Sequence, residues 1–314
     1  MTVRVLPYDP KWPMQYESLA KNIKTALLKD LVSIHHVGST SIPGLAAKKK
    51  IDIIVEVNNL CFPYQGLLDL GYEYRGGFNI PFRKTFSLRD HEIDVNLHIF
   101  ETGDPEVELN TLFRDYLRGN DAARDSYGAL KYEILKEEAS HKMKGAFYKG
   151  YTLGKNDFIE KIIQETGFKG LRFVICTHHS EWEAAKHFRN KYFFAPNNME
   201  DPYTWTFDHK DHRHLILYQG VEIVAYAHVQ LWPEQRAAIR IIEVDENKRG
   251  SSLERQFIQL IEKWLLREGY KSIHTESSPQ ALGFYKNLGY VSMPFNDPDG
   301  YEGSPNDIEM GKIL

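Results

Sequence analysis

The residues of this chain that are best suited to chemistry begin with a Gly-Ser turn and a nearby carboxylate. Gly38 and Ser39 precede an apolar run at 51–55, in which Asp52 is the single charged residue. Backbone N–H groups of such a turn can cradle a phosphate, and a carboxylate on a strand can hold a divalent metal. Metal-dependent phosphoryl transfer usually needs more acids, but Ile54 stands where a second acid is expected. The stretch therefore predicts an anion pocket with an incomplete set of metal ligands.

Further polar residues of the first half extend this candidate pocket. Asp94, Asn96 and His98 alternate with apolar residues at 94–100, so they share one face of a predicted strand. Asp94 would give Asp52 a second carboxylate for a metal such as Mg²⁺. Either one metal suffices, or the domain binds a nucleotide or another anion without transferring it. The remaining candidates for this pocket are His36, Ser41, Lys48, Arg114, Arg118, Lys131 and Lys155.

A purely structural role would also explain several of these residues. Ser39 and Ser41 are residue types that cap a helix N-terminus, and Arg114 stands beside Asp115, with which it can form an ion pair. Both interpretations stay open at the level of the sequence.

A second group of candidates follows a predicted strand that ends near residue 244. Residues 248–253 place basic and small side chains at the start of a predicted helix. The N–H groups of a helix N-terminus, helped by basic side chains, bind phosphate. Glu243, on the strand before this loop, is a candidate general base, and His228 is an alternative.

Residues 281–290, ALGFYKNLGY, match the Ala-x-x-Phe-Tyr-x-x-x-Gly-Tyr pattern near the end of GNAT-superfamily acetyltransferases. This resemblance implies a GNAT fold with a mixed sheet and an acetyl-CoA pocket between strands that splay apart. It also implies that the main chain of Ile242 and Val244 holds the pantetheine arm, and that Tyr285 protonates the leaving CoA thiolate. The resemblance further implies that a loop and the nearby Ser278 bind the cofactor, with the loop holding the pyrophosphate. The loop residues are Arg249, Gly250, Ser251, Ser252, Leu253, Glu254 and Arg255.

This loop departs from the glycine-rich pattern of that superfamily. In one alignment Ser252 and Glu254 both occupy positions where a glycine is expected, and in the other Ser252 does. Glycine there lets the backbone approach the pyrophosphate closely, and a glutamate beside a diphosphate would repel it. A degenerate or low-affinity pocket is therefore an alternative to acetyl-CoA binding.

Aromatic and histidine residues between 203 and 214 are candidates for the acceptor site. They either line that site or pack the core and the edge of a sheet. The acidic turn at 296–301 either closes a loop or attracts an amine substrate. The residues of the first group are Tyr203, Trp205, Phe207, His209, His212 and His214.

The elements that must position these residues divide the chain into two predicted domains, 1–167 and 168–314. Two glycines at 167 and 170 separate a helical segment at 156–164 from a new strand at 171–175. The first half is predicted to be α+β or α/β, with helices at 12–28, 109–118, 122–141 and 156–164 and strands at 51–57 and 94–100. The second half is predicted to have strands at 171–175, 214–218, 221–231, 237–244 and 272–276 and helices at 180–191, 253–268 and 279–288.

Composition excludes several classes of protein. The 314 residues carry a net charge of −4, which gives no general attraction to nucleic acid or to an anionic membrane. The two cysteines, Cys61 and Cys176, lie far apart, so a disulfide framework or zinc ribbon is not expected and a reducing cytoplasm is. No apolar run approaches the roughly 20 residues that span a bilayer.

A series of short segments extends along almost the whole first half. They are PYDPKW at 7–12, HVGSTSIPGLAAK at 36–48, IDI at 51–53, NLHI at 96–99, FRDYLR at 113–118, Tyr127 with Lys131, and Tyr151 with Lys155. Through these segments the first half resembles the GrpB family. This resemblance implies a nucleotidyltransferase-like fold of the DNA polymerase β-like superfamily and leaves the reaction open.

Three functions follow from these patterns. The first is an acetyl-CoA-dependent N-acetyltransferase for a small-molecule amine, fused to a GrpB-type domain that binds a nucleotide or another anion. The second makes the N-terminal domain the main catalyst, transferring a nucleotidyl or phosphoryl group. The third is a non-enzymatic ligand-sensing or scaffold protein with degenerate sites. The oligomeric state is not specified by the sequence.

Overall fold

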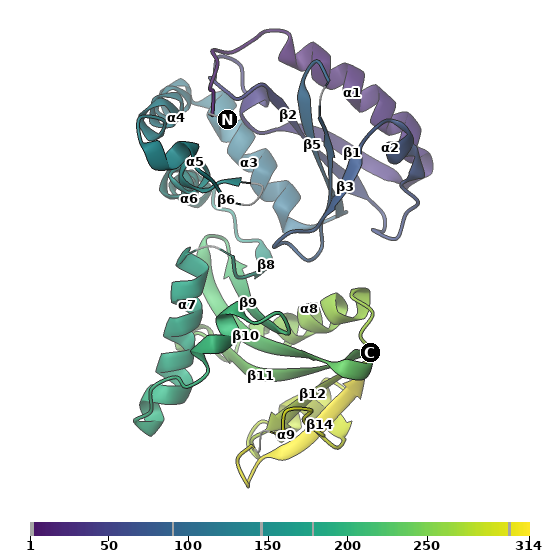
Figure 1. The fold of residues 1–314 in the computed structure, drawn as a ribbon, viewed down its shortest axis with the longest axis vertical. Coiled ribbons are helices and arrows are strands. Elements are labelled where there is room, and N and C mark those ends of the chain that lie inside the picture. Colours follow the sequence, from purple (N-terminus) through teal and green to yellow (C-terminus); the bar gives the residue numbers. More distant parts are fainter. Residues whose placement is uncertain (1–2, 90, 145–146, 178, 301–302) are drawn as a thin grey trace. The chain divides into compact units, whose positions relative to one another are not determined.

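The computed structural model describes residues 3–89, 91–144, 147–177, 179–300 and 303–314 (Figure 1). The chain forms two compact units, one of Met1–Phe78 and Phe82–Gly170, the other of Asn79–Pro81 and Leu171–Leu314. The domain boundary that the sequence predicts between residues 167 and 168 remains a proposal. Within the described residues, no helix is long and apolar enough to cross a membrane.

The first unit is built on a sheet with the strand order β1-β2-β5-β4-β3. β2 and β5 run parallel, whereas the other neighbouring strands run antiparallel. The strands are β1 (Leu31–Val37), β2 (Lys50–Val57), β3 (Glu73–Gly76), β4 (Lys84–Leu88) and β5 (Asp94–Glu101), and a separate hairpin pairs β6 (Met143–Lys144) with β7 (Phe147–Tyr148). The helices are α1 (Trp12–Leu27), α2 (Gln65–Asp69), α3 (Pro105–Gly119), α4 (Asp121–Ile134), α5 (Lys149–Leu153) and α6 (Asn156–Glu165).

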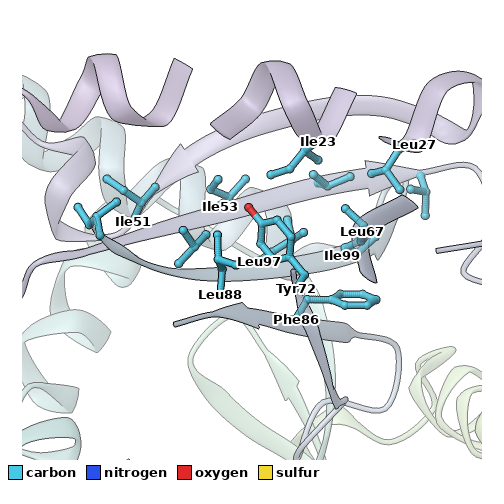
Figure 2. Packing of buried hydrophobic residues seen from close by; sticks show 14 of the residues in the cluster. Ile23, Leu27, Ile51, Ile53, Leu67, Tyr72, Phe86, Leu88, Leu97 and Ile99 are labelled. Carbon is cyan, nitrogen blue, oxygen red and sulfur yellow. The ribbon is translucent and has the colours of Figure 1, made fainter. Parts of the chain in front are cut away.

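One face of this sheet is the hydrophobic core of the first unit. Figure 2 shows Ile23 and Leu27 of α1 close to Ile53 of β2 and to Leu97 and Ile99 of β5. Because side chains alternate along a strand, the residues between these ones face the other side of the sheet. The core thus fixes the strand register that presents the polar residues of β2 and β5 together.

The second unit has a mixed sheet with the strand order β13-β14-β12-β11-β10-β9-β8, in which β11 and β12 are the parallel pair. Its strands are β8 (Leu171–Ile175), β9 (His212–Gln219), β10 (Glu222–Trp232), β11 (Arg236–Val244), β12 (Ser272–Ser277), β13 (Val291–Ser292) and β14 (Ile308–Ile313). Its helices are α7 (His179–Arg189), α8 (Leu253–Arg267) and α9 (Leu282–Asn287).

The predicted fold class is confirmed: the chain has two units that mix helices and sheets, and the second has a mixed sheet. Several details differ from the sequence prediction. Strands β1, β3 and β4 and helices α2 and α5 lie where no element was predicted. The helix predicted to reach residue 141 ends at Ile134, and a short 3₁₀ turn covers Glu138–His141. The C-terminal segment, for which no strand was predicted, contains β14, which pairs with β12 along its length.

Candidate functional site

The polar face of the first sheet opens into two neighbouring cavities. The smaller, here the Asp52 cavity, has a volume of about 280 Å³. The larger, here the arginine-lined cavity, has a volume of about 830 Å³. Lys48, Lys50 and Asn96 line both, so the two cavities share one wall. The Asp52 cavity is also lined by Gly38, Ser39, Asp52, Phe113, Tyr127, Tyr151 and Lys155, and the arginine-lined cavity by Arg4, Lys49, Arg75, Arg83, Arg89, Asp94 and His98.

Asp52 lies against the Gly-Ser turn at the start of β2. Asn96 Nδ2 on the adjacent β5 donates a hydrogen bond to Asp52 Oδ1 over 2.8 Å. Gly38 has a φ of +69°, and a Cβ at this position would lie only 2.6 Å from Oδ2 of Asp52. Glycine is therefore required here both for the backbone conformation and for the approach of the carboxylate. Burial raises the pKa of Asp52. This rise is opposed by Lys50, by the hydrogen bond from Asn96, and by Lys48 and Lys155.

Lysines surround this carboxylate. Lys131, only 1% exposed, donates from Nζ to Ser39 Oγ over 2.6 Å and to the carbonyl of Ala46 over 2.8 Å. Burial, reinforced by Lys155 and Lys48, lowers the pKa of Lys131 to about 6. Burial and the charge of Lys48 lower the pKa of Lys155 to about 8. The ammonium groups of Lys155 and Lys48 lie 4.5 Å and 4.8 Å from the centroid of the Tyr151 ring.

Five of the predicted pocket residues support the turn instead of lining either cavity: Lys131, described above, and four more. Arg114 Nη1 donates to the carbonyl of His36, and Arg118 donates to the carbonyl of Ser41 from Nε and Nη2. Arg114 also forms the ion pair with Asp115 that the structural interpretation predicts. Ser41 Oγ donates to the carbonyl of Gly38, and the His36 ring bonds to Thr40 and stacks on Tyr16. The three residues Ser39–Ser41 form a 3₁₀ turn that has no side-chain cap.

The Mg²⁺ expected from the sequence does not fit these residues. Asp52 is hydrogen-bonded by Asn96 and surrounded by lysines, and Asp94 lies 3.9 Å from Nε of Arg89. His98 is half-buried, and its partial burial together with Arg83 and Lys50 lowers its pKa to about 3. Among the described residues, no group of three His, Cys, Asp or Glu side chains is arranged to hold a metal. The expectation of a metal on Asp52 and Asp94 is therefore not supported, because cations already occupy the surroundings of both acids.

In the second unit, β11 and β12 separate partway along their length, where the sequence predicts a pocket between strands. Their pairing ends at Ile239 and Thr275, although β11 continues to Val244. The main chain of Ile242 and Val244 thus belongs to the part of β11 beyond this pairing. Tyr285 is buried beside the separation, and burial raises its pKa, with a hydrogen bond to Thr275 opposing the rise and Glu243 and Glu254 adding to it. A raised pKa keeps the phenol protonated at neutral pH.

The loop between β11 and α8, predicted to hold a pyrophosphate, leads directly into the N-terminus of α8. Gly250 has a φ of +74°, and α8 begins at Leu253 with an exposed Ser252 before it. Ser251 Oγ donates to the carbonyl of Lys248, and Ser252 Oγ accepts from Gln256 over 2.5 Å. Arg255 is exposed on the first turn of the helix and Glu254 is half-buried there. Ser278 is exposed between β12 and α9.

Glu243, the predicted general base, is held by this loop. Arg249 Nη2 donates to Glu243 Oε2 over 2.9 Å. Burial raises the pKa of Glu243, and the Arg249 guanidinium opposes the rise. The ion pair ties the carboxylate to the loop, which suits Glu243 to positioning Arg249 and opposes its protonation.

A separate pocket of about 330 Å³, here the aromatic pocket, lies between β10, β11, β12 and the segment at 193–206. Of the residues predicted for an acceptor site, Tyr203, Trp205 and His212 line it, whereas Phe207, His209 and His214 are not among its lining residues. Phe207 and His214 instead pack against each other and against Trp182. The remaining lining residues are Arg189, Phe193, Phe194, Met199, Thr206, His228, Gln230, Arg240, Ile241 and Glu276.

The histidines of the aromatic pocket are neutral. His212 Nδ1 and His228 Nε2 lie 2.8 Å apart and share a hydrogen bond whose direction depends on the tautomers. Burial lowers the pKa of His212 to about 4 and that of His228 well below its usual range. A lowered pKa makes an imidazole a weaker base, so these surroundings disfavour His228, the alternative base that the sequence suggests.

Glu276 is a candidate that sequence reasoning missed. It follows Thr275, the last residue of β12 that pairs with β11, and it lines the aromatic pocket. Burial raises its pKa, Arg240 opposes the rise, and Asp307, Asp297 and Glu309 add to it. The sequence places this residue at the end of a predicted strand, but the point where two strands separate is visible only in the fold.

The acids of the turn at 296–301 lie beside the same pocket. Asp297 forms an ion pair with Arg240, and Asp299 Oδ2 accepts from Gln230 Nε2 over 2.6 Å. The two carboxylates therefore interact with residues of the pocket wall. Tyr301, the last residue of this turn, lies outside the described residues.

Lys50 and the arginines of the larger cavity are further residues that the sequence prediction did not include. Lys50 stands two residues before Asp52 on β2, so strand alternation alone would have placed it on the same face. Arg75 and Arg83 come from segments for which no element was predicted, and their approach to β5 depends on the pairing of β4 with β5.

Comparison with known proteins identifies both units. Residues 2–165 match the family model described as GrpB protein, and residues 182–290 match that of the acetyltransferase (GNAT) family. UPF0157 protein BH1888 of Halalkalibacterium halodurans is 34% identical over 143 residues, which cover 44% of this chain and 71% of that protein. A GNAT domain supports an acyl-CoA N-acetyltransferase activity for the second unit.

Solved structures resemble each unit separately. The crystal structure of conserved protein GrpB from Enterococcus faecalis is 30% identical, with a TM-score of 0.46, covering 52% of this chain and 96% of that one. An acetyltransferase of GNAT family from Staphylococcus aureus Mu50 is 13% identical, with a TM-score of 0.38, covering 46% of this chain and 99% of that one. The family match extends over more than half of the residues, and the chain therefore belongs to the GrpB family and carries a GNAT acetyltransferase domain in its second unit.

Proposed function

We propose that the second unit transfers an acetyl group from acetyl-CoA to the amine of a small molecule. The observation that carries this proposal is the separation of β11 and β12 after Ile239 and Thr275, with Tyr285 buried beside it. The aromatic pocket supports a small acceptor, because about 330 Å³ accommodates a compact molecule within the usual range of ligand pockets.

Acetyl-CoA, when bound, supplies the acetyl group, and the residues of this chain bind it and move protons. The loop Arg249–Arg255 and the N-terminus of α8 would hold the pyrophosphate, since their N–H groups and basic side chains favour anions. Tyr285 Oη would donate a proton to the thiolate sulfur of the departing CoA. Its protonated state at neutral pH supports this role.

A carboxylate would take the proton of the attacking amine. Glu243 and Glu276 both have a raised pKa, which brings a carboxylate base closer to neutral pH. Glu276 lines the aromatic pocket, whereas Glu243 is held by Arg249. We therefore assign the base to Glu276 and retain Glu243 as the alternative, with its carboxylate positioning the loop.

Thermal unfolding of the full chain with acetyl-CoA and with CoA tests the cofactor. A ligand at 100 times its Kd should stabilise the second unit by about 2.7 kcal/mol. Release of the CoA thiol in the presence of a panel of small amines then tests the transfer. An unfolding midpoint unchanged by millimolar acetyl-CoA would contradict the proposal, and binding without thiol release would favour the ligand-sensing alternative.

We also propose that the first unit binds a nucleotide or another anion. The lysines around Asp52 and the cations of the arginine-lined cavity support this second function. Nucleotidyl or phosphoryl transfer by this unit stays an alternative, and incubation of the full chain with γ- and α-labelled ATP would test it. Anion binding itself would be tested by thermal unfolding with phosphate-bearing ligands, and no stabilisation by any of them would contradict it.

A further inference from the structure

The charge balance around Asp52 differs from that of a metal-dependent phosphate site. Lys48, Lys50 and Lys155 all lower the pKa of Asp52, so their ammonium groups act on this carboxylate. Lys131 belongs to the same group, because its pKa is affected by Lys155, Lys48 and Asp52. One carboxylate thus stands among four lysines.

This arrangement disfavours a divalent cation and favours an anion. A divalent metal would be repelled by the ammonium groups around the carboxylate, whereas the oxygens of a phosphate would be attracted. Lysine nitrogens bind phosphate as point charges, as Mg²⁺ does, and need no acidic side chains to hold them in place. The apolar Ile54 at the position of a second acid is consistent with such a site, since no second metal ligand is needed there.

The two cavities together indicate the size of the anion. The arginine-lined cavity has seven lysine or arginine side chains among its lining residues and one carboxylate, that of Asp94. It shares Lys48 and Lys50 with the Asp52 cavity. A single phosphate would reach only part of this surface, but a chain of phosphates could contact the shared lysines and extend into the larger cavity.

We infer that the first unit binds a polyphosphate chain of at least two phosphate groups without a divalent metal, with Lys48, Lys50 and Lys155 of the cavity lining supplying the positive charge that a metal would otherwise supply. This inference rests on the anion-binding function proposed above and adds the ligand class and the independence from metal. The polyphosphate is either inorganic or part of a nucleotide, because both present the same anionic oxygens.

Titration calorimetry on the full chain with inorganic tripolyphosphate, ATP and orthophosphate tests this inference. Each ligand is measured once with EDTA and once with Mg²⁺. We expect tripolyphosphate to bind in EDTA at least about tenfold more tightly than orthophosphate, because more charges are in contact. Tighter binding of ATP than of tripolyphosphate would identify a nucleotide, and the reverse would identify an inorganic or non-nucleotide polyphosphate.

Asp52→Asn separates the lysine site from a metal site, because the two predict opposite signs. If lysines hold the phosphates, removing the carboxylate removes a repulsive charge, and tripolyphosphate should bind about tenfold more tightly in EDTA. If a metal holds them, the same substitution should abolish binding. Lys155→Met should weaken binding about tenfold or more, and Lys21→Met, at an exposed position on α1, is the matched control. Thermal unfolding of each variant verifies that it is folded.

Binding that requires Mg²⁺ and is lost in Asp52→Asn would overturn the inference and leave anion binding intact. No binding of any of the three anions, with or without Mg²⁺, would overturn both the inference and the anion-binding function. Binding in EDTA that is strengthened by Asp52→Asn and weakened by Lys155→Met would support both.

Discussion

In the aromatic pocket of the second unit, Arg189 contacts Asp201 through two hydrogen bonds and Arg240 is paired with Asp297. In the Asp52 cavity of the first unit, by contrast, three lysines of the lining, Lys48, Lys50 and Lys155, share the carboxylate of Asp52. Burial acts on both sets of cations, but the carboxylates that accompany them differ in number. The pocket of the second unit is balanced by its own side chains, whereas that of the first has an excess of positive charge.

This difference indicates what each pocket can accept. A pocket whose cations are already paired can hold a neutral or weakly polar acceptor among its aromatic side chains without attracting an anion. A pocket with excess positive charge gains more from an anion, because the ligand reduces the repulsion between the lysines. The following predictions test the comparison, beginning with the largest effect.

Asp201→Asn should lower the free energy of unfolding of the second unit by about 3–5 kcal/mol, because it leaves Arg189 buried without its charge partner. The Arg189 side chain is fully buried, and its Nε and Nη2 atoms lie 2.5 Å and 2.7 Å from the two carboxylate oxygens of Asp201. Urea unfolding followed by tryptophan fluorescence would measure the loss. Glu183→Gln, which breaks the exposed pair with Lys186 on the same helix, should change stability far less. Equal effects of the two would refute the idea that this pocket depends on its internal pairing.

Tyr285→Phe should lower kcat for acetyl transfer by about 100-fold, the lower range for loss of a general acid, with little change in the KM for acetyl-CoA. Steady-state assays of CoA thiol release would measure both constants. Tyr290→Phe is the matched control, since its buried ring contacts that of Tyr285 at a centroid distance of 5.2 Å. A similar loss of kcat in both variants would indicate a packing effect and contradict proton donation by Tyr285.

Glu276→Gln should lower kcat/KM for the amine by about 30-fold, a smaller loss, because water can partly replace a carboxylate base. The rate of the unmodified protein should fall as the pH drops through the raised pKa of Glu276, since a protonated carboxyl cannot accept the amine proton. This acid limb should disappear in Glu276→Gln. If Glu243→Gln removes the limb instead, Glu243 is the base and the assignment to Glu276 is wrong.

The sequence predicted the polar face of the first sheet because that prediction needs only strand alternation. Asp94, Asn96 and His98 do line one cavity, and the Gly-Ser turn does adjoin Asp52. Arg114 and Arg118 could not be placed in this way, because their side chains reach backbone carbonyls of a segment about 78 residues earlier in the chain.

Other parts of the site depend on tertiary contacts that leave no local signal. Glu276 becomes a candidate only where β12 parts from β11, and β14 forms only because β12 offers it an edge. The segment Ile308–Ile313 contains Glu309, Gly311 and Lys312, which weaken any strand pattern in its sequence. The excess of positive charge around Asp52 likewise has no local signal, because its lysines come from β2, from α4 and from the residue that precedes α6.

The smallest effect concerns the pH dependence of stability in the first unit. Burial lowers the pKa of Lys131 to about 6 in the folded chain, below its ordinary value of 10.5. Between these two values the unfolded chain binds more protons at this residue than the folded chain, so stability should rise with pH across that range. Lys131→Met should reduce the slope by at most about 1.4 kcal/mol per pH unit, measured by urea unfolding at pH 6.5 to 9.5.

The same measurement in saturating tripolyphosphate links stability to the inferred ligand. A bound anion favours the charged form of Lys131 and Lys155 and raises their pKa toward the ordinary value. The unfolded and folded chains then bind nearly equal numbers of protons at these residues, and the slope of the unmodified protein should approach that of Lys131→Met. A slope that tripolyphosphate leaves unchanged would mean that the buried lysines do not sense the anion, and the contrast between the two pockets would then reflect burial alone.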